Sequence, residues 1–318
     1  MSNVFLGIDV GSVSTNLVAI DKDGSVLHSS YIMTAGRPID AVQKAVRGAE
    51  EPLAGHRVVG AGTTGSGRTL AAAMVGADVV KNEITAHAVA ALAVEPRACT
   101  IIEIGGQDSK LIIINDGIVV DFAMNTVCAA GTGSFLDRQA ARLDLPIEEF
   151  GRLALMSKSP VRIAGRCAVF AESDMVHKQQ IGCKTEDIVR GLCQALVRNY
   201  LNNVAKGKNI MPPVLFQGGV AANEGMRRVF EEVLGCQVIV PEHHKVMGAL
   251  GAAMLATHAK RTRFRGFEAL HRSFTSQGFE CDGCANACEV VALLMDGVTV
   301  ARWGGRCGRW ESVEAAGS

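Results

Sequence analysis

The stretch FLGIDVGSVSTNLVAI, residues 5–20, decides the fold of this chain. Its two apolar runs flank a turn of glycine and hydroxyl residues, a pattern typical of two strands joined by a tight turn. Residues 99–114, CTIIEIGGQDSKLIII, repeat the design: an apolar strand, an acidic residue, glycine, a polar turn and a second apolar strand. This internal duplication predicts an α/β protein with two lobes that begin in the same way.

The first turn carries the donors that a phosphate group needs. Gly11 lets the backbone approach an anion closely, and Asp9 before it can hold a metal-bound water. Ser12, Ser14 and Thr15 add N–H and O–H donors. The glycine spacing differs from that of Rossmann and Walker A loops. Taken by itself, the segment also fits an ordinary hairpin.

Length and charge exclude several classes of protein. A chain of 318 residues is long enough for two cores, because single cores stop growing near ~250–300 residues. A formal net charge of zero provides no field that attracts nucleic acid or an anionic membrane. No apolar run approaches the ~18 residues that a bilayer requires. We therefore expect a cytoplasmic protein that binds neither nucleic acid nor membrane.

Ten cysteines are many for the cytoplasm, where thiol clusters more often bind metal or undergo redox chemistry than form disulfides. Cys128, in CAAGTGSF, and Cys167, in GRCAVFAESDM, each lie at a small-residue turn before a helical pattern. A helix N-terminus presents unpaired N–H groups and a positive dipole end, which favour an anion. Two thiols are half the ligands of a cluster, although two buried small residues remain the alternative. The other cysteines of the first 258 residues are interpreted as core or bystander thiols: Cys99, Cys183, Cys193 and Cys236.

A possible metal pair lies on the helix predicted from residue 82. Glu83 and His87 are one helical turn apart, so they could bind a metal or cap each other. We expect the simpler arrangement, a satisfied pair on the helix surface.

The two turns resemble the phosphate-1 and phosphate-2 motifs of the actin, Hsp70 and sugar kinase superfamily. Residues 214–226, VLFQGGVAANEGM, resemble its adenosine motif, and residues 241–253 resemble the small-residue helix that connects the lobes. The resemblance implies a two-lobed ATPase with duplicated βββαβα-like lobes, in which two loops grip the phosphates of ATP or ADP with Mg²⁺. The cofactor-binding residues implied are Gly11, Ser12, Ser14, Thr15, Gly105, Gly106, Gly131, Gly133, Gly218, Gly219, Asn223 and Glu224.

Four side chains are candidates for holding the metal shell and orienting the attacking water: Asp9, Glu103, Gln107 and Asp108. Hydrolysis needs little beyond positioned phosphates, Mg²⁺ and an aligned water. Glu103 occupies a position at which many members of the superfamily have aspartate. Its side chain is one methylene longer, so its role in the metal shell departs from the pattern of the superfamily.

Three motifs together, IGGQDS, CAAGTGSF and GRCAVFAESDM, resemble the activators of 2-hydroxyacyl-CoA dehydratases and the ATPase subunits of benzoyl-CoA reductases. The resemblance covers about residues 4–257. It implies a homodimer that shares one [4Fe-4S] cluster, with Cys128 and Cys167 as the ligands from each chain. The helices after these cysteines would then aim their dipoles and N–H groups at the cluster.

This resemblance implies an ATP-dependent reductase that delivers single electrons at low potential to a partner iron–sulfur enzyme. The acceptor would be a 2-hydroxyacyl-CoA dehydratase, a benzoyl-CoA reductase or a double-cubane cluster protein, and ferredoxin or flavodoxin would be the donor. Two alternatives stay open: a nucleotide- and redox-responsive sensor or scaffold without electron delivery, and, less favoured, a small-molecule kinase.

The C-terminal region adds a second thiol cluster. Cys281, Cys284 and Cys288 lie within eight residues, and Cys307 follows two short alternating runs at 290–294 and 298–303. Four thiols in this spacing predict a metal site, which we expect to be a second [4Fe-4S] cluster; zinc is the alternative, although only one pair has CxxC spacing. The segment resembles one found in longer members of the CoA-activase group, such as the reductase of double-cubane cluster proteins.

The sequence predicts three parts. A two-lobed ATPase domain covers residues 1–258, with lobe I at 1–95 plus 245–258 and lobe II at 96–244. A basic connector follows at 259–276, and a β-hairpin module with the four cysteines ends the chain at 277–318.

Overall fold

The computed structural model describes residues 2–125 and 128–313. Residues 126–127 of the cysteine turn and 314–318 of the predicted C-terminal module lie outside the described residues. The chain forms two compact units, residues 1–90 with 248–318 and residues 91–247, which are described separately below. Within the described part, no helix is both long enough and apolar enough to span a bilayer.

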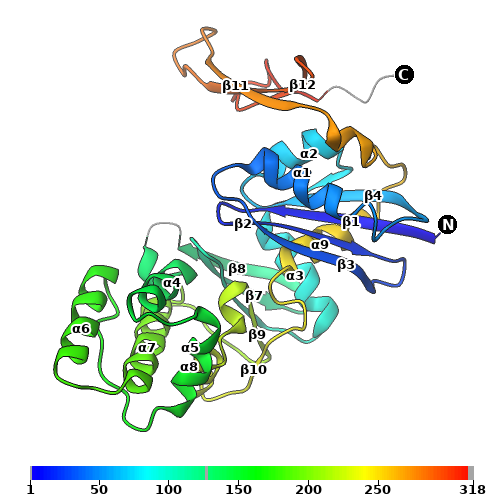
Figure 1. Cartoon of the computed structure of the whole chain (residues 1–318). Helices are drawn as coiled ribbons and strands as arrows, with labels where there is room; N and C mark the ends of the chain where they lie inside the picture. The colour runs from blue at the N-terminus through cyan, green and yellow to red at the C-terminus, as the bar shows by residue number, and fades with distance from the viewer. Residues whose placement is uncertain (1, 126–127, 314–318) are drawn as a thin grey trace. The chain divides into compact units, whose positions relative to one another are not determined.

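Unit 1 is built on a five-stranded sheet with the order β3-β2-β1-β4-β5 (Figure 1). The hairpin predicted for residues 5–20 is confirmed, because β1 pairs antiparallel with β2 from Phe5–Ile20 to Val10–Thr15. On its other side β1 is parallel to β4. The strands are β1 (Ser2–Val10), β2 (Ser14–Ile20), β3 (Val26–Met33), β4 (His56–Thr64) and β5 (Val79–Val80).

The small-residue helix α9 returns to this sheet. A Cβ atom on Gly7 or Gly62 would clash with the α9 backbone at Ala249 or Ala252, so these strands accept the helix only because they carry glycine. Gly251 lies equally close to the backbone of Ala86 in α3. The helices of this unit are α1 (Pro38–Gly48), α2 (Arg68–Val75), α3 (Glu83–Val94) and α9 (Met247–Ala256).

Unit 2 repeats the design, which confirms the duplication inferred from the sequence. Its sheet has the order β10-β9-β6-β7-β8, and β6 is antiparallel to β7 and parallel to β9. The strands are β6 (Thr100–Ile104), β7 (Ser109–Asn115), β8 (Ile118–Asn125), β9 (Val214–Gln217) and β10 (Val238–Ile239). The helices are η1 (Ala129–Gly131), α4 (Gly133–Arg142), α5 (Ile147–Met156), α6 (Ala168–Gln180), α7 (Thr185–Asn203), η2 (Gly219–Ala222) and α8 (Glu224–Leu234).

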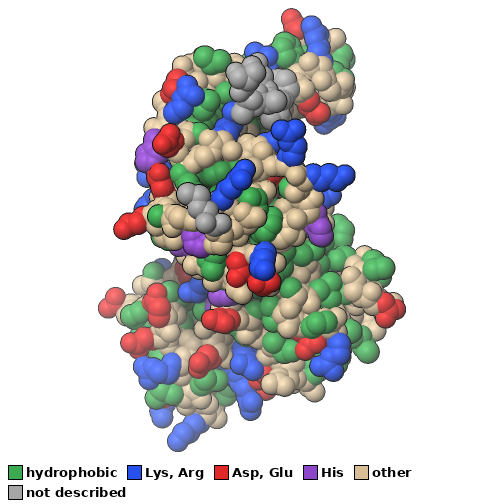
Figure 2. Space-filling view, turned by 90° about the vertical axis from the view of Figure 1, so that its right-hand side faces the viewer, with side chains coloured by type: hydrophobic (Ala, Val, Ile, Leu, Met, Phe, Trp, Pro, Cys, Tyr) green, Lys and Arg blue, Asp and Glu red, His purple; other side chains and the backbone are tan. Residues whose placement is uncertain are grey.

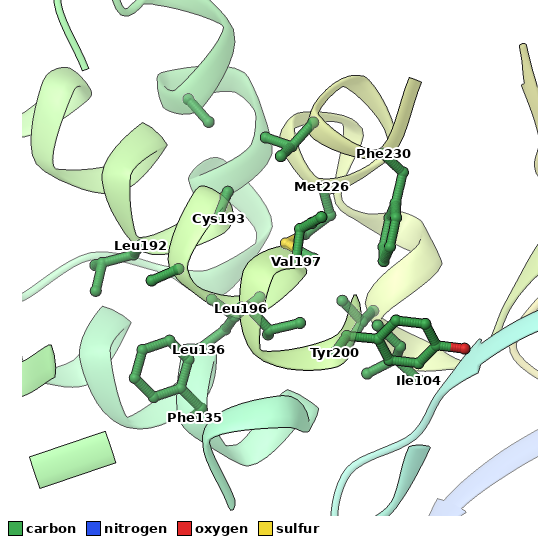
Figure 3. Close-up of a cluster of buried hydrophobic side chains, with 14 of the residues drawn as sticks. Ile104, Phe135, Leu136, Leu192, Cys193, Leu196, Val197, Tyr200, Met226 and Phe230 are labelled. Carbon is green, nitrogen blue, oxygen red and sulfur yellow. The ribbon is translucent and has the colours of Figure 1, made fainter. Parts of the chain in front are cut away.

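The core of unit 2 forms around α7. Leu192, Leu196 and Tyr200 of this helix are fully buried and point into the apolar cluster shown in Figure 3. Tyr200 packs edge-on against Phe230 of α8, with 5.7 Å between ring centroids. Its hydroxyl donates to the carbonyl O of Lys110 on β7 at 2.7 Å, so α7 is anchored to the sheet by a buried polar bond as well as by packing.

The C-terminal segment forms a four-stranded antiparallel sheet that packs on unit 1. The predicted runs at 290–294 and 298–303 are strands β12 (Glu289–Met295) and β13 (Val298–Trp303). The sequence did not indicate β11 (Phe274–Glu280), which begins inside the predicted connector, or β14 (Ser312–Val313). Leu270, Phe274 and Leu293 join the core of unit 1. Residues 259–276 are therefore packed in part, with Leu270 buried in the 3-10 helix η3 (Glu268–His271).

Candidate functional site

The turn after β1 is closed by its own backbone and hydroxyls. Gly11 N–H donates to the carbonyl of Ser14 at 2.9 Å. The hydroxyl of Thr15 lies 3.0 Å from that of Thr34, which donates to the carbonyl of Gly11 at 2.9 Å. Thr15 is fully buried, whereas Ser12 is exposed. The Thr15 hydroxyl is thus engaged within the turn, and Ser12 is the predicted donor that faces outward.

Asp9, at the end of β1, lies in a space that two glycines leave open. A Cβ on Gly65 would clash with its Oδ1 atom, and a Cβ on Gly248 would clash with its Oδ2 atom. The same Cβ position on Gly248 lies 3.3 Å from Nε2 of His87. His87 is only 6% exposed, so the expectation of a pair on the helix surface is wrong for this residue. The structure therefore places a buried imidazole beside the candidate metal-shell carboxylate.

The turn after β6 is organised by a lysine that was not among the predicted site residues. Lys110 Nζ lies 2.9 Å from Glu103 Oε2 and 2.9 Å from Asp108 Oδ2. The side chains of Lys110 and Glu103 are 3% and 6% exposed, and that of Asp108 is 34% exposed. Residues 108 and 110 are two apart at the start of β7, a spacing that puts side chains on one side of extended chain and that could have indicated this pair from the sequence. Of the two carboxylates, Asp108 is the more accessible to a metal or water, and Gln107 is exposed next to it.

The residues of the adenosine-like motif lie next to the turn after β6. Gly218 has a φ of +88°, and a Cβ there would stand 2.7 Å from Glu103 Oε1. His244 holds this glycine through its backbone carbonyl, which accepts from Gly218 N–H at 2.9 Å, and through Nδ1, which donates to the Gly218 carbonyl at 3.0 Å. Burial lowers the pKa of His244, which favours the neutral ring. Asn223 caps α8 by accepting from Met226 N–H at 3.0 Å, and Gly219 and Glu224 beside it are exposed.

The Cys128 loop is held by two asparagines. Asn125 accepts from the Cys128 backbone N–H at 2.9 Å and donates to its carbonyl at 2.8 Å. Asn199 of α7 points Nδ2 at the Cys128 Sγ atom at 3.9 Å. A Cβ on Gly131 would come 2.8 Å from Asn199 Oδ1 and 2.9 Å from Asn125 Nδ2. Gly131 therefore serves the packing of this loop.

The Cys167 loop meets the same asparagine. Asn199 Nδ2 donates to the carbonyl of Gly165 at 2.6 Å, so one amide reaches both cysteine loops. Cys167 is the N-cap residue of α6, as the sequence predicts, and both thiols are free and partly buried. One thiol before a 3-10 turn and one at the start of α6, with an N–H donor beside the first, fit half of the ligand set of a [4Fe-4S] cluster.

The helix after Cys128 differs from the expectation. A 3-10 turn intervenes, and α4 begins only at Gly133. The N–H groups of Gly133 and Ser134 donate to the carbonyls of Gly105 and Gly106 at 2.8 and 2.9 Å. The start of α4 is thus bonded to the turn after β6, and of the two α-helices α4 and α6 only α6 has its first residue directly after a candidate ligand.

The four C-terminal cysteines lie at one end of their sheet, after β11, before β12 and after β13. Cys281 N–H donates to the carbonyl of Cys288 at 2.9 Å. The Cys281 thiol is buried and accepts from Trp310 Nε1 at 3.1 Å, a bond that lowers its pKa. Cys284 and Cys307 are exposed. Among residues 2–125 and 128–313, no three His, Cys, Asp or Glu side chains are gathered as a metal site requires. The four-thiol metal site stays a prediction.

The remaining thiols lie outside the loops described above. All ten cysteines are free. Burial raises the pKa of Cys193 to about 12, which keeps it a neutral core side chain. Cys99, Cys183 and Cys236 are partly buried in unit 2.

Residues 6–256 match the model of the BadF/BadG/BcrA/BcrD ATPase family. The chain belongs to this family. The (R)-2-hydroxyglutaryl-CoA dehydratase activating ATPase of Acidaminococcus fermentans is 34% identical over 263 residues, which are 80% of this chain and 98% of that protein. The resemblance to dehydratase activators stated from the motifs is confirmed. The segment after residue 256, with its four cysteines, lies outside the matched region.

Solved structures agree with this assignment. The activator of the 2-hydroxyisocaproyl-CoA dehydratase from Clostridium difficile, with bound ADPNP, has a TM-score of 0.71 at 29% identity and covers 84% of this chain and 96% of its own. A ROK family glucokinase from Streptomyces griseus, in complex with glucose and AMPPNP, has a TM-score of 0.50 at 17% identity and covers 80% of this chain and 99% of its own. That likeness shows the fold alone. The predicted actin, Hsp70 and sugar kinase type of fold is confirmed.

Proposed function

We propose that this protein is an ATP-dependent reductase that couples ATP hydrolysis to one-electron transfer from a [4Fe-4S] cluster shared by two subunits. The observation that carries the proposal lies in unit 2. The Cys128 loop leads into α4, whose first N–H groups are bonded to the phosphate-2 turn at Gly105 and Gly106. A change at the phosphates has a short, hydrogen-bonded route to a candidate cluster ligand.

The nucleotide would be bound as Mg²⁺–ATP by the turns after β1 and β6. Ser12 and Ser14 of the first turn and Gly105 and Gly106 of the second would contact its phosphates, and Gly218 and Gly219 would pack on the nucleoside. Asp9 and Asp108 would hold the metal and its water, and Gln107 is exposed next to Asp108. Glu103 is paired with Lys110, so we assign it to shaping this turn.

The cluster requires a second copy of the chain, because each subunit offers two ligands, Cys128 and Cys167. A cluster bound there would supply the transferable electron. The start of α6 fits a covered surface, since Val169 and Phe170, two and three residues after Cys167, are each 67% exposed. Burial of such large apolar side chains against a partner lowers the free energy of the complex.

The proposed acceptor is an iron–sulfur enzyme of the kind that the relatives activate, a 2-hydroxyacyl-CoA dehydratase or a benzoyl-CoA reductase, or a double-cubane cluster protein. Ferredoxin or flavodoxin is the proposed donor. On the face shown in Figure 2, Lys and Arg side chains are interspersed with Asp and Glu side chains.

The deciding experiment is anaerobic purification followed by single-turnover reduction of an oxidised dehydratase. The expected protein is brown, contains about two iron atoms per chain in the shared site, and reduces the acceptor with ATP but not with a non-hydrolysed analogue. A brown protein that hydrolyses ATP and reduces no acceptor would be a redox-responsive sensor. A colourless protein after reconstitution with iron and sulfide would refute the proposal.

A further inference from the structure

We infer that Asn199 is a positioning residue that fixes both cysteine loops of one subunit and supplies an N–H donor to the sulfur of Cys128. The inference rests on the proposed shared cluster. Asn199 is 2% exposed, and its Nδ2 atom lies 2.6 Å from the carbonyl O of Gly165 and 3.9 Å from Cys128 Sγ. An amide nitrogen has two hydrogens, so it can serve both acceptors at once.

The orientation of this amide is fixed by its neighbours. Asn203, one turn further along α7, donates to Asn199 Oδ1 at 3.1 Å, which leaves the NH₂ group for the two loops. Gly131 packs so closely that a Cβ there would stand 2.8 Å from Asn199 Oδ1. The next residue, Tyr200, anchors α7 to β7 through the Lys110 carbonyl. Asn199 therefore stands on a rigid element, as a residue that positions metal ligands must.

Two consequences follow from the contacts. Bonds from N–H groups to cluster sulfurs stabilise the reduced, more negative state and so raise the reduction potential. A bond to the Gly165 carbonyl keeps the turn that carries Cys167 beside the turn that carries Cys128. Removal of the donor should therefore disfavour reduction and loosen the cluster while leaving the phosphate turns in place.

The test uses the full-length protein, purified anaerobically, with the variants Asn199→Ala and Asn199→Asp. The aspartate keeps the size and the Oδ1 acceptor but replaces the donor. At a fixed potential the ratio of reduced to oxidised cluster should fall at least threefold, which corresponds to about 28 mV for a one-electron couple. Iron loss to a chelator should be faster, and ADP affinity should stay within twofold. Asn202→Ala is the matched control, since Asn202 is exposed on the same helix.

Each outcome decides the inference. An unchanged redox titration and unchanged iron retention in both variants would overturn it. Loss of iron with normal ADP binding and circular dichroism supports it. A colourless wild type would refute the proposed cluster, a separate failure. If the Asn199 variants do not fold, Gly131→Ala replaces them, because its Cβ must push the same amide. A redox titration of Gly131→Ala that matches that of the wild type would also overturn the inference.

Discussion

A buried lysine holds together the two carboxylates of the turn after β6. Lys110 donates to both Glu103 and Asp108 and carries the backbone carbonyl that Tyr200 binds. Removing one partner of a buried ion pair is strongly destabilising, because the other partner is then left charged and unpaired in the interior. Glu103 therefore depends on Lys110 more than a surface glutamate depends on its partner.

We expect Lys110→Met to lower the free energy of unfolding by about 3–5 kcal/mol, because Glu103 loses its counter-charge in a buried site. Urea unfolding followed by circular dichroism measures the change. The double variant Glu103→Gln with Lys110→Met should recover much of the loss. Lys208→Met is the control, since Lys208 pairs with Asp121 at an exposed site and should have little effect. A small effect of Lys110→Met would show that Glu103 finds another partner.

The space around Asp9 provides a second test at this scale. Gly65 and Gly24 have nearly the same φ, +87° and +86°, but of these two only Gly65 would bring a Cβ into a clash with Asp9. Gly65→Ala should therefore lower ATPase activity about tenfold or more, because overpacking costs roughly 1–3 kcal/mol and here displaces the carboxylate. Gly24→Ala reports the backbone strain alone and should retain activity. Equal activities in steady-state assays would argue against a role for Asp9.

Among the elements, α7 connects the most features of unit 2. Asp187 in its first turn accepts from the Ser157 hydroxyl at 2.7 Å and from the backbone N–H groups of Ser159 and Lys158 at 3.0 and 3.2 Å. These bonds, led by that from Ser157, lower the pKa of Asp187. At the other end, Asn199 and Tyr200 hold the cysteine loops and β7. The helix thus joins the segment before Cys167 to the sheet.

A carboxyl group whose pKa is lower in the folded than in the unfolded state stabilises the fold at pH values above its unfolded pKa, about 4. This contribution is lost as the pH falls through the folded pKa. We therefore expect Asp187→Asn to lower the melting temperature at pH 7, and the difference from wild type to shrink as the pH drops below about 4. Thermal melts at several pH values measure this. Glu186→Gln, a partly exposed neighbour in the same turn, should show no such trend. A pH-independent difference would mean that the bonds do not need the charge.

For the whole molecule, the two groups of cysteines belong to different units and should behave independently. Cys128→Ser should remove the proposed shared cluster and lower the iron content by about two atoms per chain, while nucleotide binding is kept. Cys284→Ser with Cys307→Ser should change only the metal bound at the C-terminal site. Metal analysis with iron and zinc determined separately distinguishes the two. Loss of both metals in either variant would show that the sites assemble together.

Several features followed from the sequence alone because they depend on local pattern. The strand, turn and strand of residues 5–20 and their copy at 99–114 are set by alternating apolar runs and glycine-containing turns, and both hairpins are present. Cys167 at a helix start was also readable from its neighbours. Family membership followed from motifs that combine these local patterns.

Tertiary structure alone decided which side chains meet. Lys110 could be paired with Glu103 only once β6 and β7 were in register, and Asn199 could be joined to Cys128 and Gly165 only once α7 crossed unit 2. The burial of His87 beside Gly248 and the packing of residues 264–274 on α1 and α2 depend likewise on contacts far apart in the chain. Local periodicity fixes which face of an element is apolar, but a contact between distant side chains is set by the packing of whole elements.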